Sequence, residues 1–422
     1  MELFERMAYY GMFNVLALYM TGPQIGGSLG FSKTSAGFMM GIYTFLLYML
    51  PLLGGAFAER YGYKKTFVIS LSVLSLAYFS LSFAKDYWLV FLVLTAVAVG
   101  GALFKPTLTG TISRSTNESN SSLGFGIYYL LVNIGSFCAP FIASYLRIMS
   151  WNYVFYASAI WVALMLLPAL FVYKEPKEHL DADKSGVLKV FKDSFLVMKD
   201  LRFMLLILIF SGFWLVYFQL FFTMPIFLQN YVSTVPLLEF VANISSSLHL
   251  PFQSMLQDRL LSIEAGKILV SEAIPPEIMI GINAGTIIVL QLVVSRLTEK
   301  IKPLTAIIAG IFITALSMFL TGISVNAWII VLAIFALAIG EMSASPRFLQ
   351  YVGSSAPKDK VALFLGYGFI PTGVGSLLAN IMGGYLIDKG LAFGLIWTIY
   401  GIIAVLTGVL LIIYAKYINT TK

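Results

Sequence analysis

The side chains that could do chemistry first appear at the start of the sequence, in the run ELFERMAYYG of residues 2–11. On a helix, Glu2 lies four residues before Arg6 and three before Glu5, so these three side chains share one face. Tyr9, four residues after Glu5, adds a phenol. This cluster can exchange protons or bind a charged group. The alternative is a solvated helix start with acids at the positive end of the dipole, although Arg6 there opposes the dipole and needs partners.

Two further charges lie inside apolar stretches, Lys105 within GALFKPTLTG and Glu341 within GEMSASPRFLQ. A charge at the centre of a spanning helix costs about 2.5–3.5 kcal/mol on insertion scales, so its presence usually indicates a function. For Lys105 the alternative is a long side chain that reaches the membrane surface. We expect this base and this acid to come from corresponding helices of two similar halves and to face each other across a central pathway. Glu341 would then suit a reversible proton carrier.

The composition is typical of a membrane protein. Of the 422 residues, 59% are hydrophobic and only 11% are charged, whereas a soluble domain carries about 25% charged residues. The net charge of +7 belongs mostly to loops beside the membrane, so it does not indicate nucleic-acid binding. The lone Cys138 cannot form an internal disulfide and is interpreted as a small buried hydrophobe. The two histidines lack metal-ligand spacing and no GxxxxGK loop is present, so we predict neither a metal nor a nucleotide cofactor.

Twelve apolar stretches long enough to span a bilayer follow one another along the chain. They fall near 5–25, 34–57, 66–84, 88–113, 123–147, 151–173, 203–231, 275–297, 304–322, 327–352, 361–387 and 391–416. This pattern predicts an all-α polytopic membrane protein with a six-helix bundle over 1–173, a cytoplasmic linker over 174–202 and a second bundle over 203–422. Parallel halves of this kind place a binding site near the bilayer midplane at their interface.

Lysine and arginine are unevenly distributed among the segments between these stretches. Most of the 27 fall in segments that are cytoplasmic if both chain termini lie inside the cell. Because positive residues favour the cytoplasmic side, the sequence predicts a multi-pass protein of the plasma membrane with both termini cytoplasmic.

Residues 232–274, between the seventh and eighth stretches, form an extracytoplasmic insertion that this simple plan does not explain. The apolar residues within 255–270 suit an amphipathic helix that lies on the protein or on the membrane. We interpret the insertion as a small structural cap. The alternative is a lid or a surface that binds a protein partner.

Several of these motifs resemble the proton-coupled oligopeptide transporter family within the major facilitator superfamily. ELFERMAYYGM is similar to its ExxER motif with paired tyrosines, and KPTLTG to its Lys-Pro-Asn stretch, with Thr107 in place of asparagine. Residues 124–146 resemble its fifth helix, and residues 340–358 its GE-three-residues-SP pattern that ends in Ala-Pro. GGAFAERYGYKK is similar to a loop of the wider superfamily, with Glu59 in place of aspartate.

The resemblance implies a major facilitator fold of about 12 transmembrane helices and a proton-coupled symporter that imports di- and tripeptides by alternating access. The proton gradient would supply the energy, without a soluble cofactor. Arg6 and Lys105 would receive the carboxylate of the peptide, and Glu341 its amino group. The other implied substrate-binding residues are Tyr9, Tyr10, Tyr43, Tyr48, Asn133, Asn283 and Ser345, although Tyr43 and Tyr48 could instead serve helix packing. The implied proton-coupling residues are Glu2, Glu5, Arg6 and Glu341.

The sequence also departs from this family. Phe218 stands where family members commonly carry an acid, although Gln219 is retained, so Lys105 lacks its expected acidic partner. Asn283 is followed by Ala284 instead of proline. The linker is too short for the two extra helices of many bacterial members, and the insertion has no counterpart. Because Met1 directly precedes the ExxER motif, we expect an N-terminal tail to be absent or trimmed.

These departures leave two rival interpretations. The first is a related transporter of another small solute, such as a sugar, nitrate, a drug or an amino acid, which Phe218 and the insertion favour. The second is a receptor or a partner-dependent membrane protein that uses the insertion as its interaction surface. An enzyme is not predicted, because no nucleophile–base pair or metal pair is visible in the sequence.

Overall fold

The computed structural model describes residues 1–116, 120–175, 200–249, 253–266, 269, 272–356 and 361–418. The first part of the chain contains α1 (Glu2–Thr21), η1 (Gln24–Gly26), α2 (Lys33–Met49), α3 (Pro51–Tyr61), α4 (Tyr63–Leu81), α5 (Tyr87–Ser115), α6 (Ser121–Met149), α7 (Trp151–Leu164) and α8 (Leu166–Phe171). The second part contains α10 (Leu201–Tyr217), η3 (Phe218–Leu220), α11 (Thr223–Tyr231), α12 (Val235–Ser247), α13 (Gln253–Glu264), α14 (Pro276–Glu299), α15 (Pro303–Ile323), α16 (Ala327–Ser355), α17 (Val361–Tyr367), α18 (Ile370–Asp388), α19 (Phe393–Ile413) and η5 (Tyr414–Ile418).

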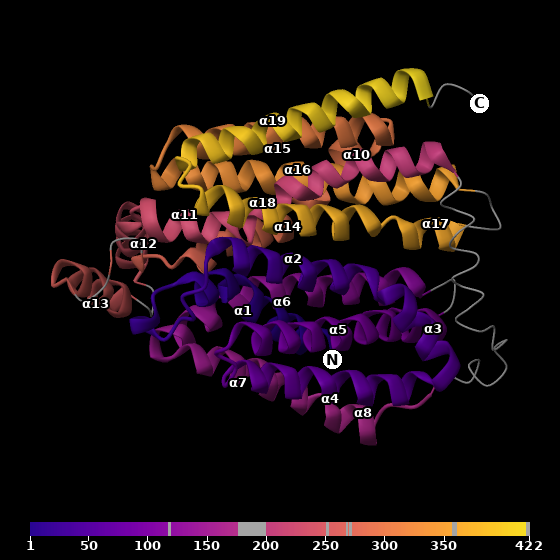
Figure 1. The fold of residues 1–422 in the computed structure, drawn as a ribbon, viewed down its shortest axis with the longest axis horizontal. Coiled ribbons are helices and arrows are strands. Elements are labelled where there is room, and N and C mark those ends of the chain that lie inside the picture. The colour runs from indigo at the N-terminus through magenta and orange to yellow at the C-terminus, as the bar shows by residue number, and fades with distance from the viewer. Residues whose placement is uncertain are drawn as a thin grey trace.

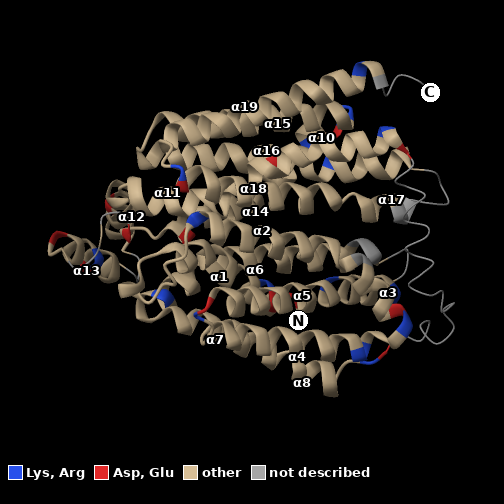
Figure 2. Cartoon of the chain, viewed as in Figure 1, with Lys and Arg blue, Asp and Glu red and all other residues tan. Residues whose placement is uncertain are grey.

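The long helices run roughly side by side and form two groups that follow the order of the chain. Figure 1 shows the indigo to magenta helices α1–α8 in the lower part of the view and most of α10–α19 in the upper part, whereas α13 lies at the far left, level with α1 and α6. Charged residues gather mainly toward the two ends of the helices, and few lie between them (Figure 2). We call the end that carries α12 and α13 the α13 end, and the opposite end, with α3 and α17, the α3 end. Most of the predicted linker 174–202 lies outside the described residues.

The number of spans agrees with the expected architecture. Among the described residues, ten helices are long and apolar enough to cross a membrane, or eleven if the bent pair α2–α3 is one span. The remaining long helix, α1, is less apolar because it contains Glu2, Glu5 and Arg6. These helices confirm the all-α polytopic membrane fold predicted from the sequence.

Several stretches predicted as single helices are broken. The predicted helix over 34–57 bends by 47° between α2 and α3, where Pro51 begins the second helix. The seventh stretch consists of α10 and α11 separated by the 3₁₀ turn η3. Long apolar runs conceal such breaks, because apolar periodicity reports burial and not the direction of the backbone. Proline at the first position of a helix fits there because its missing N–H has no partner to lose.

Side-chain caps fix where several helices begin. Asp86 accepts hydrogen bonds from the backbone N–H groups of Trp88 and Leu89 at the start of α5. Asp200 does the same for the first turn of α10, and Asn326 accepts from Trp328 at the start of α16. Each cap satisfies backbone donors that have no partner within the helix.

The two groups of helices meet most closely where α2 packs against α18. A Cβ atom added at Gly37 would lie 2.2 Å from the carbonyl oxygen of Asn380, and one added at Gly384 would lie 2.1 Å from the carbonyl oxygen of Lys33. At the α13 end, the Asp388 carboxylate accepts hydrogen bonds from the backbone N–H groups of Lys33 (3.1 Å) and Thr34 (2.7 Å). The C-terminal end of α18 is therefore joined to the N-terminal end of α2, where the helix dipole favours a negative charge.

The insertion 232–274 differs from the expected single amphipathic helix within 255–270. It contains two helices, α12 and α13, which share a small apolar cluster around Leu238, Ala242 and Leu256. The second helix ends at Glu264, and Gly266 follows in a left-handed conformation (φ 68°) that glycine adopts without strain. Residues 267, 268 and 270 of the predicted helix lie outside the described residues.

The close contact between α2 and α18 predicts a strong effect of a small substitution. Replacing Gly37 by Ala places a methyl group against the backbone of Asn380, and such overpacking costs about 1–3 kcal/mol. Thermal unfolding of the purified protein in detergent should therefore occur at a lower temperature. Gly126→Ala is the matched control, because a Cβ atom there meets no atom within 4 Å. Equal unfolding temperatures for the two variants would contradict the tight α2–α18 contact.

Candidate functional site

The acid–base cluster predicted at the start of α1 is present and buried. Glu2, Glu5 and Arg6 are each at most 3% exposed. The Arg6 guanidinium lies 3.2 Å from the Glu2 carboxylate and forms a second ion pair with Glu5. One guanidinium is thus shared by two carboxylates, so a proton on either carboxyl group would leave Arg6 paired with the other.

Neighbouring residues fix the position of Arg6 within the helix bundle. Its guanidinium lies 5.0 Å from the ring centroid of Tyr9 and 5.9 Å from that of Tyr10, a distance at which cations are attracted to aromatic rings. On the other side, a Cβ atom at Gly135 of α6 would lie only 2.7 Å from the Arg6 Cβ. Glycine at this position therefore lets α6 approach α1 at the level of the cluster.

A polar cavity of about 170 Å³ lies between α1 and α6 of the first group and α14 and α16 of the second. Four predicted substrate-binding residues line it: Tyr10, Asn133, Asn283 and Glu341. The sequence predictions did not include Asn14, Tyr129, Ser136 and Tyr217, which also line it. Tyr217 comes from α10 and the other three come from α1 and α6, so their positions depend on how these helices pack, and no motif marks them. Asn14, one helical turn after Tyr10, is the one that helical spacing could have indicated.

Glu341 is held in this cavity by neutral partners. The Asn283 amide donates a hydrogen bond of 3.2 Å to the Glu341 carboxylate and one of 3.1 Å to the Tyr217 hydroxyl. Glu341 forms no ion pair with a described residue. The Asn283 Oδ1 atom is buried without a hydrogen-bond partner among the described residues. The cavity therefore offers both an uncompensated carboxylate and a free amide oxygen to a ligand that carries N–H donors.

Lys105 lines a second cavity of about 320 Å³, nearer to the α3 end. Tyr48 and Tyr128 line this cavity with it, and Gly366 and Phe369 contribute from the second group of helices. Lys105 is close enough to Glu2 and Glu5 for electrostatic attraction, but it forms no ion pair with a described residue. We expected from the sequence that Lys105 and Glu341 face each other across one pathway. The structure instead places them in two separate cavities.

Aromatic side chains near the two cavities come from both groups of helices. The rings of Tyr48 and Phe218 lie 6.0 Å apart, and Phe218 also packs against Tyr217 at 6.0 Å. Phe218, at the position where the related family commonly has an acid, is only 3% exposed. It therefore fills space between Tyr48 and Tyr217 and supplies no charge to Lys105.

The other predicted site residues lie outside both cavities. Tyr9 is 5% exposed and stacks on Phe13, with the ring centroids 5.2 Å apart. Tyr43 is 1% exposed, and its hydroxyl is buried without a described partner. Ser345 lies on α16, partly exposed, one helical turn beyond Glu341. Among the described residues, no group of three His, Cys, Asp or Glu side chains could hold a metal ion.

Comparisons with known proteins place the chain among membrane transporters. A model of the Major Facilitator Superfamily matches residues 6–271. Multidrug resistance protein MdtH of Photorhabdus laumondii is 23% identical over 93% of this chain and 89% of that protein. Dipeptide and tripeptide permease B of Aliivibrio fischeri is 32% identical, but the match covers 41% of this chain and only about a third (34%) of the permease.

The fold also matches solved structures. A POT family transporter in complex with 5-aminolevulinic acid aligns with a TM-score of 0.77 over 100% of this chain and 95% of that one. At 19% sequence identity, this likeness shows a shared fold.

The buried cluster predicts a large loss of stability when Arg6 alone is changed. Arg6→Gln leaves the Glu2 and Glu5 carboxylates buried without a cation, and breaking a buried ion pair in this way costs about 3–5 kcal/mol. The unfolding temperature of the purified variant should fall markedly.

The matched control is the triple variant Arg6→Gln, Glu2→Gln, Glu5→Gln, which removes all three charges and should recover much of the stability. If the single and triple variants unfold at the same temperature, ion pairing does not stabilise the cluster.

Proposed function

Because the chain belongs to the Major Facilitator Superfamily, we propose that it is a proton-coupled importer of di- and tripeptides. In this proposal it lies in the plasma membrane with both termini in the cytoplasm. It works by alternating access, in which two six-helix halves rock about a central site. Two observations support this choice of substrate. The sequence of α1 is similar to the ExxER motif of the oligopeptide transporters, and part of the chain matches a dipeptide and tripeptide permease.

The observation that carries the proposal is the polar cavity shared by both groups of helices. A peptide presents an ammonium group and backbone N–H groups, which suit the Glu341 carboxylate and the unpartnered oxygen of Asn283. Asn133 and Tyr10 offer further hydrogen bonds on the opposite wall, from α6 and α1. A solute held between both walls would favour the conformation in which the halves are closed around it.

The charges around the two cavities suit a zwitterion. Glu341 is the anion of one cavity, whereas Lys105 lines the other and Arg6 lies buried beside Tyr10. In the proposed binding step, the peptide carboxylate approaches Arg6 and Lys105, and the halves move so that the two cavities join. The POT family structure contains 5-aminolevulinic acid, a small molecule that also combines an amine and a carboxylate.

Proton coupling would follow from the sharing of one guanidinium by Glu2 and Glu5. A proton on one of these carboxyl groups releases one of the two ion pairs of Arg6. The freed donors can then bind the carboxylate of the peptide through charge-assisted hydrogen bonds. Transport of the peptide and of the proton would thus depend on the same cationic side chain.

Drug transport is the second candidate, and specific observations favour it. The match to the multidrug resistance protein covers nearly the whole of both chains. Aromatic rings from both groups, including Tyr48 and Phe218, pack between the helices, and Phe218 replaces an acid that peptide transporters commonly carry. Aromatic surface would suit planar, apolar cations. The two candidates are distinguished by measuring whether dipeptides displace a bound drug from the purified protein. Displacement would favour the peptide transporter, and binding of the drug that dipeptides do not affect would favour the drug transporter.

The first functional prediction concerns energy coupling. In sealed vesicles that contain the purified protein, accumulation of a labelled dipeptide should require an inward proton gradient. An uncoupler should abolish accumulation, because it dissipates the proton gradient that would drive protons through the buried carboxyl groups. Protein-free vesicles control for leakage. Accumulation that is unchanged by the uncoupler would contradict proton symport.

The second functional prediction tests recognition of the peptide termini. A charge-assisted hydrogen bond contributes about 1.5–3 kcal/mol, which corresponds to roughly 10- to 150-fold in affinity. Glu341→Gln should therefore weaken binding of free-amine peptides by this factor and affect N-acetylated peptides far less. Lys105→Ala should penalise free carboxylates more than C-terminal amides. Binding is measured on the purified protein, away from proton coupling.

Each of these variants serves as the control for the other, since the two should show opposite patterns. If both lose affinity equally for blocked and unblocked peptides, these residues do not bind the termini. A neutral solute or a drug would then be the better substrate.

A further inference from the structure

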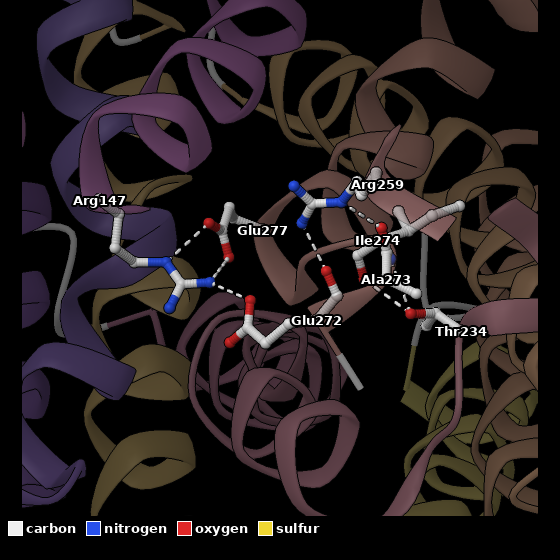
Figure 3. A network of polar contacts seen from close by, with 7 residues as sticks. All are labelled: Arg147, Thr234, Arg259, Glu272, Ala273, Ile274 and Glu277. Carbon is white, nitrogen blue, oxygen red and sulfur yellow. Dashed lines mark hydrogen bonds and ion pairs between the residues drawn. The ribbon is translucent and has the colours of Figure 1, made fainter. Parts of the chain in front are cut away.

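A partly buried ion-pair network joins the two groups of helices at the α13 end. Arg147, in the last turn of α6, lies 2.9 Å from the Glu277 carboxylate through Nε and 2.6 Å from that of Glu272 through Nη2. Both acids belong to the second group of helices. Figure 3 shows the Arg147 guanidinium between these two carboxylates.

The network is more than a surface contact, because Glu277 is buried, the other two side chains are at most 15% exposed, and all three are oriented. Glu277 is 0% exposed and Arg147 is 11% exposed at its side chain. Arg147 lies at the C-terminal end of α6 and Glu277 in the first turn of α14, so each charge also complements the dipole of its own helix. The Arg147 guanidinium further lies 5.2 Å from the ring centroid of Trp151.

The α12–α13 insertion positions one of the two acids. Arg259 of α13 donates hydrogen bonds to the backbone carbonyls of Ala273 (2.8 Å) and Glu272 (2.5 Å). Thr234, just before α12, bonds to both the N–H and the carbonyl of Ile274, at 2.8 and 3.1 Å. The segment 272–274 is thus held by Thr234 at the start of the insertion and by Arg259 of α13 (Figure 3). Its conformation directs the Glu272 carboxylate at Arg147.

Between this network and the polar cavity, α6 and α14 pack against each other through small residues. A Cβ atom at Gly281 would lie 3.4 Å from Pro140, and one at Gly285 would lie 3.0 Å from Phe137. These contacts follow one another from the α13 end toward the polar cavity, whose walls include Asn133 and Ala284. Separation of α6 from α14 at this end would therefore expose the cavity from the α13 side, and it would have to break the Arg147 pairs.

We propose that Arg147, Glu277 and Glu272 form an interhelical latch that holds the α13 end closed, and that the α12–α13 insertion sets the strength of this latch. Glu277 supplies the fixed pair, and Glu272 supplies a second pair that exists only while Arg259 and Thr234 hold its backbone. We call the contacts of Arg259 and Thr234 with residues 272–274 the brace, because they would make opening of the α13 end less favourable. The latch rests on the proposed movement of the two halves, but not on the identity of the solute.

Distances between spin labels, measured by pulsed electron resonance on the full-length protein without substrate, test the latch. Cys138 is first replaced by Ser, and cysteines are introduced at Trp88 and Val325, which are 71% and 56% exposed. Trp88 lies in the first turn of α5 and Val325 just before α16, both at the α13 end and one in each group of helices. A longer distance between them reports separation of the groups at that end.

Arg147→Gln and Glu277→Gln should raise the ratio of long to short distances by roughly 10-fold or more, since each removes a charge-assisted pair. Glu272→Gln and Arg259→Gln should shift the ratio in the same direction by a smaller factor. Glu264→Gln is the matched control, because Glu264 is an exposed acid of α13 outside the network. It should leave the distances unchanged.

The charge-swapped variant Arg147→Glu, Glu277→Arg separates electrostatic latching from a general loss of packing. It should restore the short distance at least in part. Wild-type distances in Arg147→Gln and Glu277→Gln would overturn the latch, as would opened single variants that the swap does not rescue. Wild-type distances in Arg259→Gln and Glu272→Gln would overturn the brace. Failure to bind peptides, with the latch response intact, would count only against the proposed substrate.

Discussion

An ionised side chain inside a lipid bilayer must find its partners within the protein, and this constraint determines where the polar residues of this chain lie. Arg6 is surrounded by Glu2 and Glu5, and Arg147 by Glu272 and Glu277. Both clusters sit where helices touch, because only there does the protein exclude lipid from the charges. Glu341 and Lys105 are the exceptions, because neither forms an ion pair with a described residue, and each lines a cavity where a solute can approach.

Small residues make these charged contacts possible. Helices in lipid gain little from burying apolar surface against one another, so close backbone approach must supply much of the attraction. Gly135 brings α6 against α1 beside Arg6, and Gly37 and Gly384 bring α2 against α18. The contact between α2 and α18 crosses between the two groups of helices. Tight packing and access to the cavities are therefore coupled, since neither group can move without separating some of these surfaces.

Local features of the site could be predicted from the sequence, whereas long-range ones could not. The Glu2–Glu5–Arg6 cluster follows from helical spacing within one segment, and the structure contains it. The placement of Lys105 and Glu341 in separate cavities depends on how two distant helices tilt, which spacing does not encode. Apolar runs located the spans but concealed the breaks within them. Helix α12 was missed because its short apolar face packs against partners distant in the sequence, which are α13, Ala273 and Trp328 of α16.

The break between α10 and α11 gives the second group of helices a joint next to the cavities. At η3 the regular backbone ladder is interrupted, and Gln219 bonds instead to the carbonyls of Leu215 and Ala379, each at 3.1 Å. Thr223 in turn donates to the Gln219 side chain. The Gln219 side chain thus supplies hydrogen bonds to backbone carbonyls at the point where the helix is irregular. The Gln219 side chain also ties the joint to α18 through the carbonyl of Ala379, so the irregular turn keeps its polar groups paired within the protein at the depth of the cavities.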